Sequence, residues 1–383
     1  MALALYIHWP FCARKCPYCD FNSHVRAEVD QNIWRDALLA DLVHEASLTG
    51  AQELGSIFFG GGTPSLMPPA TVAALIDAAS RYWRLADDIE ITLEANPSSV
   101  EAANFAALAS AGVNRVSLGL QSLDDAALQF LGRLHGATEG LAALATAQRQ
   151  FARVSFDLIY ALPGQSPAAW EAQLAQALGL GTGHVSLYQL TIEPGTRFAT
   201  LVRDGSLSPL ADDPAADLFA LTRAMTDAAG FAAYEVSNHA RPGEQSRHNL
   251  AYWRYRDYVG VGPGAHGRRG GLATLRHKKP ENWLEAVTHR GDGIHSETAL
   301  NRPEQAAEAL LMGLRLAEGI DLGAIAARFG YAPDALIVPD KVALYARLGL
   351  VERAGDRLTV TPAGMPLLDA LLAELVAPAL VAA

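Results

Sequence analysis

Residues 6–21 read YIHWPFCARKCPYCDF, and this segment decides how the rest of the chain is interpreted. All three cysteines of the chain, Cys12, Cys16 and Cys19, lie in it with the spacing C-x₃-C-x₂-C. They directly follow an apolar run over residues 3–8 that is typical of a β-strand. Because a disulfide framework would use an even number of cysteines spread along the chain, their confinement to one loop indicates a metal site.

The number and spacing of the cysteines favour a 4Fe–4S cluster, whose usual ligands are cysteine thiolates. Three thiolates leave the fourth iron without a protein ligand, as a cluster that reacts with another molecule requires. Arg14 and Lys15 lie between the first two cysteines and would help to keep the thiolates deprotonated. The alternative is a structural zinc ion bound by the three cysteines and a histidine such as His24, although structural zinc more commonly uses paired C-x₂-C units.

The length and composition of the chain limit its class. Its 383 residues, 50% hydrophobic and 19% charged, allow two or three domains with a large buried core and exclude a disordered chain. The formal net charge of −11 argues against non-specific binding to nucleic acid or to an anionic membrane. No apolar run reaches the roughly 20 residues of a membrane helix, so we expect no intrinsic span, while peripheral membrane association through a partner stays open. Residues 1–10 read as a strand and not as a signal peptide, which predicts a cytoplasmic protein.

Short apolar runs alternate with segments of helical spacing over the first 200 residues or so. One such helical segment places Trp34, Leu38 and Leu42 on one face. This alternation predicts βα units with buried parallel strands, and six units indicate either an incomplete barrel or an open parallel sheet. In both architectures ligands bind at the carboxyl ends of the strands. The predicted strands cover residues 3–8, 56–59, 89–94, 113–120, 154–160 and 184–190.

The second half of the chain does not continue the regular alternation of strands and helices. A helix is expected from Asp213 to about Ala229, then a strand over residues 231–236, then a stretch rich in Gly, Pro, Arg, His and aromatic residues. The C-terminal part predicts three helices and a hairpin, which resembles a winged helix, but its acidic excess argues against DNA binding. Its expected elements are helices over 304–317, 322–329 and 339–348 and a hairpin over 350–361. We therefore expect three domains: 1–235, a connecting region over 236–295, and a C-terminal domain over 296–383.

The cysteine loop resembles that of the radical S-adenosylmethionine (SAM) superfamily, whose signature is C-x₃-C-x₂-C after the first strand of a six-unit partial barrel. The resemblance implies that the amino and carboxylate groups of SAM chelate the open iron. An electron from the cluster could then cleave SAM to a 5′-deoxyadenosyl radical, while the protein orients the cofactor and keeps it dry.

Side chains near the ends of the predicted strands could form a SAM pocket. Gly61, Gly62 and Thr63 follow the second strand, where glycine lets the backbone approach a ligand closely, although a tight turn into a helix would use the same residues. Glu94 ends the third strand and could bind ribose hydroxyls or act as a partner for a helix N-terminus. Arg133 could neutralise the carboxylate of SAM.

Together these residues resemble the SAM-binding residues of one subgroup, that of oxygen-independent coproporphyrinogen III oxidase and its relatives. Gln121, which ends the fourth strand, and Asp157, within the fifth, belong to the same pattern. The resemblance implies that SAM is bound by Tyr6, Gly61, Gly62, Thr63, Glu94, Gln121, Arg133 and Asp157.

Two details are similar to one branch of that subgroup, the HemW haem chaperones. Phe21 stands where the oxidases carry an additional cysteine, and residues 248–253, HNLAYW, match the motif H-N-x-x-Y-W of the HemW branch. The resemblance implies a chaperone that binds haem and passes it to acceptor haem proteins. It also implies that His248 ligates the iron while Tyr252 and Trp253 pack on or beside the ring.

Several alternatives stay open at this point. Judged from the residues alone, Tyr252 and Trp253 could be core aromatics with His248 as a hydrogen-bonded core residue. His239 and His266 are rival haem ligands. The chain could instead be a radical-SAM oxidative decarboxylase of coproporphyrinogen III, or an interaction module that uses its C-terminal region. In a chaperone, SAM and the cluster would serve structure, regulation or transfer, so no catalytic residue is assigned.

Overall fold

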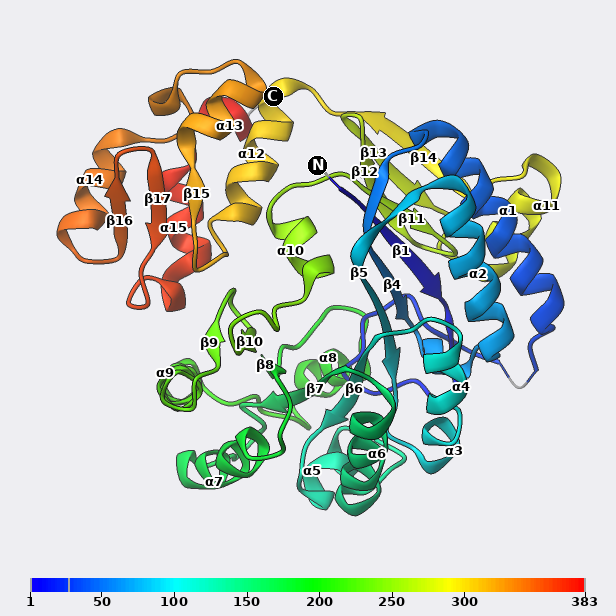
Figure 1. Ribbon diagram of the computed structural model, residues 1–383. Helices are drawn as coiled ribbons and strands as arrows, with labels where there is room; N and C mark the ends of the chain where they lie inside the picture. Colours follow the sequence, from blue (N-terminus) through cyan, green and yellow to red (C-terminus); the bar gives the residue numbers. More distant parts are fainter. Residues whose placement is uncertain (1, 27, 382–383) are drawn as a thin grey trace.

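The centre of the protein is a twelve-stranded sheet, seen here in a computed structural model that describes residues 2–26 and 28–381 (Figure 1). The strand order is β14-β13-β12-β11-β1-β4-β5-β6-β7-β8-β10-β9. The strands from β11 to β8 in this order pair in parallel, and six of these seven are the strands that the sequence predicts. These are β1 (Leu3–Trp9), β4 (Glu53–Gly61), β5 (Arg84–Ala95), β6 (Arg115–Gln121), β7 (Arg153–Tyr160) and β8 (His184–Gln189). Because β14 and β9 end the sheet on opposite sides, the barrel is incomplete.

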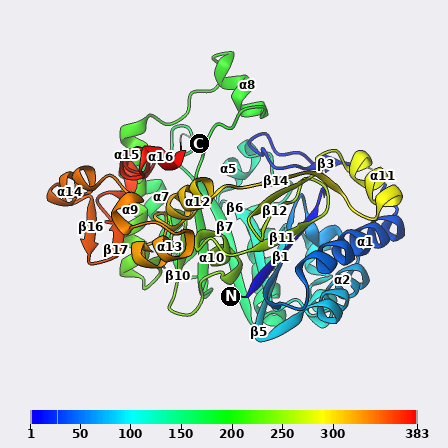
Figure 2. The same cartoon turned by 90° about the horizontal axis from the view of Figure 1, so that it is seen from above.

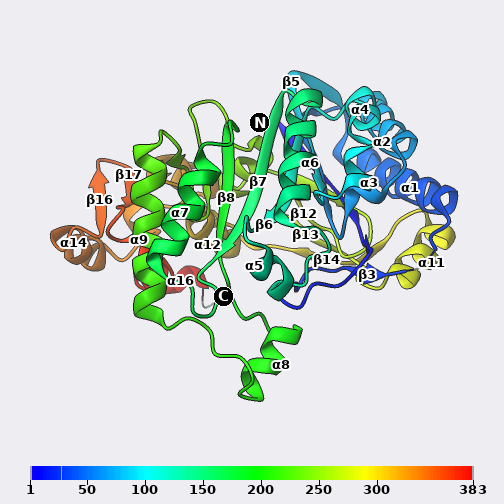
Figure 3. The ribbon, with the colours of Figure 1, turned by 90° about the horizontal axis from the view of Figure 1, so that it is seen from below.

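Helices cover the outer side of the parallel strands, and Figure 3 shows α6 and α7 beside β6, β7 and β8. In α1 the predicted face of Trp34, Leu38 and Leu42 is buried, and Asp30 caps the helix by accepting from the N–H groups of its first turn. The helix predicted from Asp213 is α9. The helices of this part are α1 (Gln31–Thr49), α2 (Pro69–Tyr82), α3 (Ser99–Ala102), α4 (Phe105–Ser110), α5 (Asp125–Phe130), α6 (Ala137–Gln150), α7 (Pro167–Leu178), α8 (Arg197–Arg203) and α9 (Asp212–Ala228). Figure 2 shows α8 projecting away from the rest of the protein.

The residues after α9 extend the sheet at both edges. The elements are β9 (Ala232–Ala233), β10 (Asn238–Ala240), α10 (Arg247–Trp253), β11 (Tyr258–Val261), β12 (His266–Arg269), β13 (Leu272–Arg276), α11 (Pro280–Arg290) and β14 (Ile294–Ala299). The strand predicted over 231–236 is wrong beyond Ala233, because the N–H of Tyr234 donates to the carbonyl of Asn238 (3.1 Å) and closes a tight hairpin. After α10, which packs on β4 and β1, the chain returns as β11 in parallel beside β1.

A buried ionic network attaches α1 to the β12–β13 edge of the sheet. The guanidinium of Arg276 donates to Asp41 (2.8 Å) and to Glu45 (2.8 Å), and all three side chains are fully buried. Asp41 also accepts from the N–H of Gly262 (3.0 Å), in the loop that follows β11. Since unpaired buried charges are costly, this network fixes the position of that loop relative to the barrel.

The C-terminal region has its own apolar core and follows the predicted order of three helices and a hairpin. Helix α12 begins after a capping box at Asn301 but ends at Gly313 and not at residue 317, because the N–H of Ala317 donates to the carbonyl of Tyr234 (3.0 Å) at the sheet edge. The elements are α12 (Arg302–Gly313), β15 (Ile320–Asp321), α13 (Leu322–Phe329), α14 (Pro339–Arg347), β16 (Val351–Ala354), β17 (Arg357–Val360), α15 (Leu368–Leu375) and α16 (Pro378–Val381). None of the helices in the described part of the chain has the length and apolar character needed to cross a bilayer.

Candidate functional site

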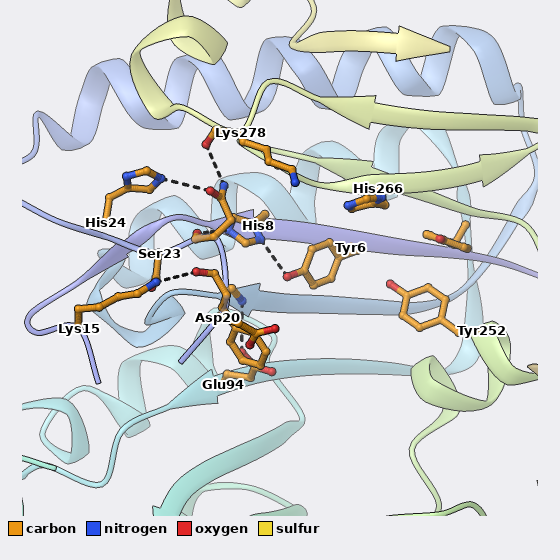
Figure 4. A pocket seen from close by; sticks show the side chains of 15 residues that line it. Tyr6, His8, Lys15, Asp20, Ser23, His24, Glu94, Tyr252, His266 and Lys278 are labelled. Atoms are coloured by element: carbon orange, nitrogen blue, oxygen red, sulfur yellow. Dashed lines mark hydrogen bonds between the residues drawn. The ribbon is translucent and has the colours of Figure 1, made fainter. Parts of the chain in front are cut away.

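A cavity of about 670 Å³ opens at the carboxyl ends of β1, β4 and β5, within the size range of small-molecule sites (Figure 4). Three parts of the chain line it. The strand wall is defined here as Tyr6, His8, Gly61 and Glu94. The cysteine loop contributes Lys15 and residues 20–23, with His24 after it. The edge wall is defined as Tyr252, Tyr258, Gly264, His266 and Lys278.

Each cysteine sulfur lies next to a hydrogen-bonding side chain. The pairs are Cys12 with Thr63 (Sγ to Oγ1, 3.4 Å), Cys16 with Arg133 (Sγ to Nη1, 3.6 Å) and Cys19 with Ser23 (Sγ to Oγ, 4.0 Å). In the metal-free protein burial raises the pKa of the thiols of Cys12 and Cys19, so these two must lose protons when metal binds. Donors of this kind stabilise thiolates and tune the potential of a bound cluster.

Asn96 connects two of these donors. Its Oδ1 accepts from Nη2 of Arg133 (2.6 Å), and its Nδ2 donates to Oγ1 of Thr63 (3.1 Å). Nε of Arg133 is buried without a hydrogen-bond partner among the described residues. A buried guanidinium with a spare donor beside a cysteine sulfur fits an anionic ligand at this position, as the carboxylate of SAM would be.

The arrangement of the cysteines gives no support to a single zinc ion. Over residues 2–26 and 28–381, no group of three or more His, Cys, Asp or Glu side chains is arranged to hold one metal ion. Nε2 of His24, the proposed fourth zinc ligand, lies 3.2 Å from Oδ1 of Asn22. The thiolates of a 4Fe–4S cubane bind three different irons and need not converge on one point.

The strand wall carries two titratable groups that are largely neutral at pH 7. Nε2 of His8 donates to the carbonyl of Asn22 (2.9 Å), so Nδ1 accepts from the hydroxyl of Tyr6 (3.0 Å). Burial lowers the pKa of His8 to about 4. Burial and the neighbouring charge of Asp157 raise the pKa of Glu94 to about 8, although the carboxylate accepts from the N–H of Gly61 (3.3 Å).

Steric constraints explain the glycines that follow β4. Gly61 has φ +113°, and a Cβ there would lie 2.5 Å from Cε1 of His8. A Cβ on Gly62 would lie 2.7 Å from the carbonyl oxygen of Phe11, where the cysteine loop begins. The two glycines thus allow β4 to pack closely against the cysteine loop, which agrees with the alternative of a tight turn. Gly61 also borders the cavity, which agrees with a role in ligand binding.

Two further predicted SAM residues lie on the neighbouring strands β6 and β7, and neither is among the described residues that line the cavity. Gln121 ends β6 with φ +68°, a left-handed conformation that is strained for a non-glycine residue and is often found at functional sites. Its amide and the guanidinium of Arg133 both flank Gly119. Asp157 on β7 accepts from Ser117 (3.4 Å), and burial raises its pKa to about 6.

The HNLAYW segment forms α10, and its three predicted haem-contacting residues face different surroundings. His248 is 1% exposed, with Nδ1 2.9 Å from Oγ of Ser56 and Nε2 2.7 Å from the hydroxyl of Tyr252. Burial lowers its pKa to about 3. Tyr252 lines the cavity, whereas Trp253 packs with Leu316 near the C-terminal domain. His248 therefore faces the protein interior, and its role as iron ligand stays a prediction.

The two rival histidines also differ. His239 on β10 is 1% exposed, and burial lowers its pKa to about 3. His266 lines the cavity together with Tyr6 and Tyr252, and Figure 4 labels all three. Of the three histidines considered as haem ligands, His266 is the one that borders the cavity.

Sequence reasoning missed four residues that shape the site. His8 and Asn96 lie close to predicted positions, and their places at the ends of β1 and β5 could have revealed them. Asn22 donates to the carbonyls of Pro263 (2.8 Å) and Lys278 (2.9 Å), and Lys278 itself lines the cavity. These contacts join segments more than 200 residues apart, and no local pattern signals them.

Comparison with known proteins identifies the family. Residues 6–175 match the Radical SAM superfamily, and residues 300–367 match the HemN C-terminal domain. The chain is 38% identical over 379 residues to the Heme chaperone HemW of Escherichia coli, and the match covers 97% of both chains. The chain belongs to the HemW family. Membership implies a 4Fe–4S cluster and SAM as cofactors, as the cysteine loop predicts.

Two other relatives place the HemW family in a wider context. The chain is 45% identical to the mitochondrial Radical S-adenosyl methionine domain-containing protein 1 of Bos taurus, over 83% of this chain and 74% of the relative. The solved structure of coproporphyrinogen III oxidase (HemN) from Escherichia coli superposes with a TM-score of 0.83 over 97% of this chain and 89% of that one. At 23% identity this likeness concerns the fold, and it confirms the predicted radical-SAM architecture with its C-terminal domain.

Proposed function

We propose that this protein is a haem chaperone, which binds haem in the cavity and delivers it to acceptor haem proteins. The observation that carries the proposal is the meeting of two motifs at one cavity. The strand wall carries the predicted SAM residues Tyr6, Gly61 and Glu94, and the loop that contains the three cysteines borders the same cavity. Tyr252 of the H-N-x-x-Y-W motif lies on the facing edge wall. Near-complete coverage of a HemW relative supports it, because both motifs fall inside the match.

The residues around the cysteine loop fit a SAM-coordinated cluster. Cys12, Cys16 and Cys19 would hold it, with hydrogen bonds from Thr63 and Arg133 to two of the sulfurs. When bound, SAM and the cluster supply one-electron chemistry. The chain itself orients the cofactor. Glu94 is placed to accept hydrogen bonds from the ribose hydroxyls, and the spare Nε–H of Arg133 can donate to the carboxylate of SAM. Tyr6, Gly61, Gly62, Gln121 and Asp157 complete the proposed SAM residues.

A catalytic oxidase is not favoured. The likeness to coproporphyrinogen III oxidase concerns the fold alone, and Phe21 occupies the position at which the resemblance leads us to expect an oxidase cysteine. We also propose a cytoplasmic location. The three cysteines are not paired in disulfides, and the cytoplasm is a compartment that keeps thiols reduced. The acceptor proteins are proposed by class only, as apo-proteins that take up haem.

Haemin titration of the anaerobically reconstituted protein tests the proposal. We expect a saturable shift of the haem Soret band, followed by transfer of that haem to an apo haem protein added in excess. In parallel, the same preparation is incubated with coproporphyrinogen III, SAM and a reductant. Stoichiometric release of CO₂ would show that the protein is the oxidase and not a chaperone. A Soret band that does not change when the protein is added would show that the protein does not bind haem and therefore cannot deliver it.

A further inference from the structure

The H-N-x-x-Y-W motif presents its tyrosine and not its histidine to the cavity. Tyr252 lines the cavity beside Tyr258 and His266, while His248 lies behind it with its ring stacked on Phe58 (4.8 Å between centroids). Both ring nitrogens of His248 already have partners, the hydroxyls of Ser56 and Tyr252. A haem in the cavity would therefore meet the hydroxyl of Tyr252 before it could reach His248.

We propose that Tyr252 coordinates the iron of ferric haem through its phenolate oxygen, and that His248 is a positioning residue that holds this oxygen. The inference rests on the proposed function and names the iron ligand of that same site. Tyrosinate is an established axial ligand of haem iron. A ligand side chain is usually oriented by a second hydrogen-bonding group behind it, which is the place that His248 occupies.

The change in protonation balances without a charge on His248. For the haem-free protein we place the proton of neutral His248 on Nδ1, so that the hydroxyl of Tyr252 donates to Nε2 (2.7 Å) and Nδ1–H donates to Ser56 (2.9 Å). On coordination the O–H bond of Tyr252 breaks, an O–Fe(III) bond forms and one proton leaves to solvent, with no change in iron oxidation state. His248 exchanges tautomer, so that Nε2–H donates to the phenolate and Ser56 donates to Nδ1.

Other groups on the edge wall suit the rest of a haem. Lys278 is an exposed cation on the same wall and is placed for a propionate. The ring of Tyr258 lies 4.4 Å from that of Tyr252 in an edge-to-face contact, which adds aromatic surface for a flat macrocycle. Within the described residues no hydrogen bond orients the ring of His266, the rival ligand, so it lacks the support that Tyr252 has.

The protein contains a matched internal control. Tyr234 and His184 form a second hydrogen-bonded pair (hydroxyl to Nε2, 3.0 Å), buried and away from the cavity lining. Tyr234→Phe removes the same hydroxyl from the same kind of pair. It separates loss of a haem ligand from general loss of a buried tyrosine–histidine contact.

Resonance Raman spectroscopy of the ferric haem complex tests the inference. Wild type and Tyr234→Phe should both show phenolate vibrations of an iron-bound tyrosinate, and Tyr252→Phe should lose them, with a fall in haem affinity of at least about tenfold. His248→Gln should keep the vibrations but shift them, which a merely structural histidine would not do. Circular dichroism and cluster content establish that each variant is folded.

The outcomes separate the two proposals. If wild type binds haem without phenolate vibrations, or if they persist in Tyr252→Phe, the ligand assignment is overturned. His266→Ala then shows whether that histidine ligates instead. If wild type binds no haem at all, the chaperone function itself fails and the ligand assignment falls with it.

Discussion

The two walls of the cavity are built on different principles. Side chains of the strand wall are held by close neighbours, and His8 and Glu94 have pKa values that leave them largely neutral at pH 7. The edge wall is more open to solvent at His266 and Lys278, and Lys278 gives it a positive charge. A rigid, uncharged wall suits a cofactor that stays in place, whereas an open wall suits a bulky ligand that must enter and leave. The difference supports the proposal that cofactor and cargo use opposite sides of one cavity.

The largest expected effect falls on the cysteine loop. Cys16→Ala should abolish the 4Fe–4S cluster, because each of the three sulfurs holds a different iron and no spare cysteine exists in the chain. Iron and sulfide analysis of the anaerobically reconstituted variant measures this. Thr63→Val, which removes the hydrogen bonds of the Thr63 hydroxyl with Cys12 and Asn96 but leaves all three sulfurs, is the matched control and should keep the cluster. A full complement of iron and sulfide in Cys16→Ala would contradict the assignment of this loop.

A second prediction concerns the network that joins the edge wall to the barrel. Arg276→Met should lower the free energy of unfolding by about 3–5 kcal/mol, because it leaves the buried carboxylate of Asp41 without its charged partner. Urea unfolding followed by tryptophan fluorescence measures it, since Trp283 donates to Asp41 (3.2 Å). Arg254→Met breaks a half-exposed ion pair with Glu318 and should cost at most about 1 kcal/mol. Equal losses in the two variants would show that the edge wall does not depend on the network.

A third prediction uses the pKa of Glu94, which is about 8 in the empty cavity. The sulfonium and ribose hydroxyls of SAM favour the carboxylate, so the pKa of Glu94 is lower in the complex and binding releases a proton. Affinity should therefore rise with pH below about 8 and level off above it, by about tenfold between pH 7 and pH 9. Calorimetric titration with SAM at several pH values measures this. In Glu94→Gln the part of the pH dependence that comes from Glu94 should disappear. If the affinity of this variant for SAM keeps the wild-type pH dependence, the released proton comes from another group.

The sequence predicts the strand wall far better than the edge wall, for physical reasons. The cysteines, Gly61 and Glu94 lie within a few residues of strand ends whose apolar runs are visible in the chain, and parallel strands bring such ends together. The edge wall depends on β11 pairing with β1, with Gly260 opposite Tyr6. No local pattern encodes a pairing across some 250 residues. His248 shows the same limit of sequence-based prediction. Its motif marks it as a candidate functional residue but does not say whether its side chain faces the cavity or the protein interior.

The contact between the walls gives the smallest expected effect. Asn22 on the cysteine loop donates to the carbonyls of Pro263 and Lys278, and both acceptors are backbone groups beside the edge wall. Asn22→Ala removes these two hydrogen bonds and a third, between its Oδ1 and Nε2 of His24 (3.2 Å), each with a net contribution of about 1 kcal/mol. It leaves the Asn22 carbonyl that accepts from His8. We therefore expect local loosening without loss of the fold.

Hydrogen exchange shows whether that loosening crosses the cavity. In Asn22→Ala the amides of residues 20–25 and of residues 262–266 should both exchange faster, because the lost hydrogen bonds held the two segments to each other. Asn32→Ala changes an exposed residue of α1 whose side chain, among the described residues, is hydrogen-bonded to Arg35 alone, and it should leave both segments unchanged. Faster exchange confined to residues 20–25 would mean that the walls move independently. A cargo bound at the edge wall would then have no direct mechanical route to the cluster.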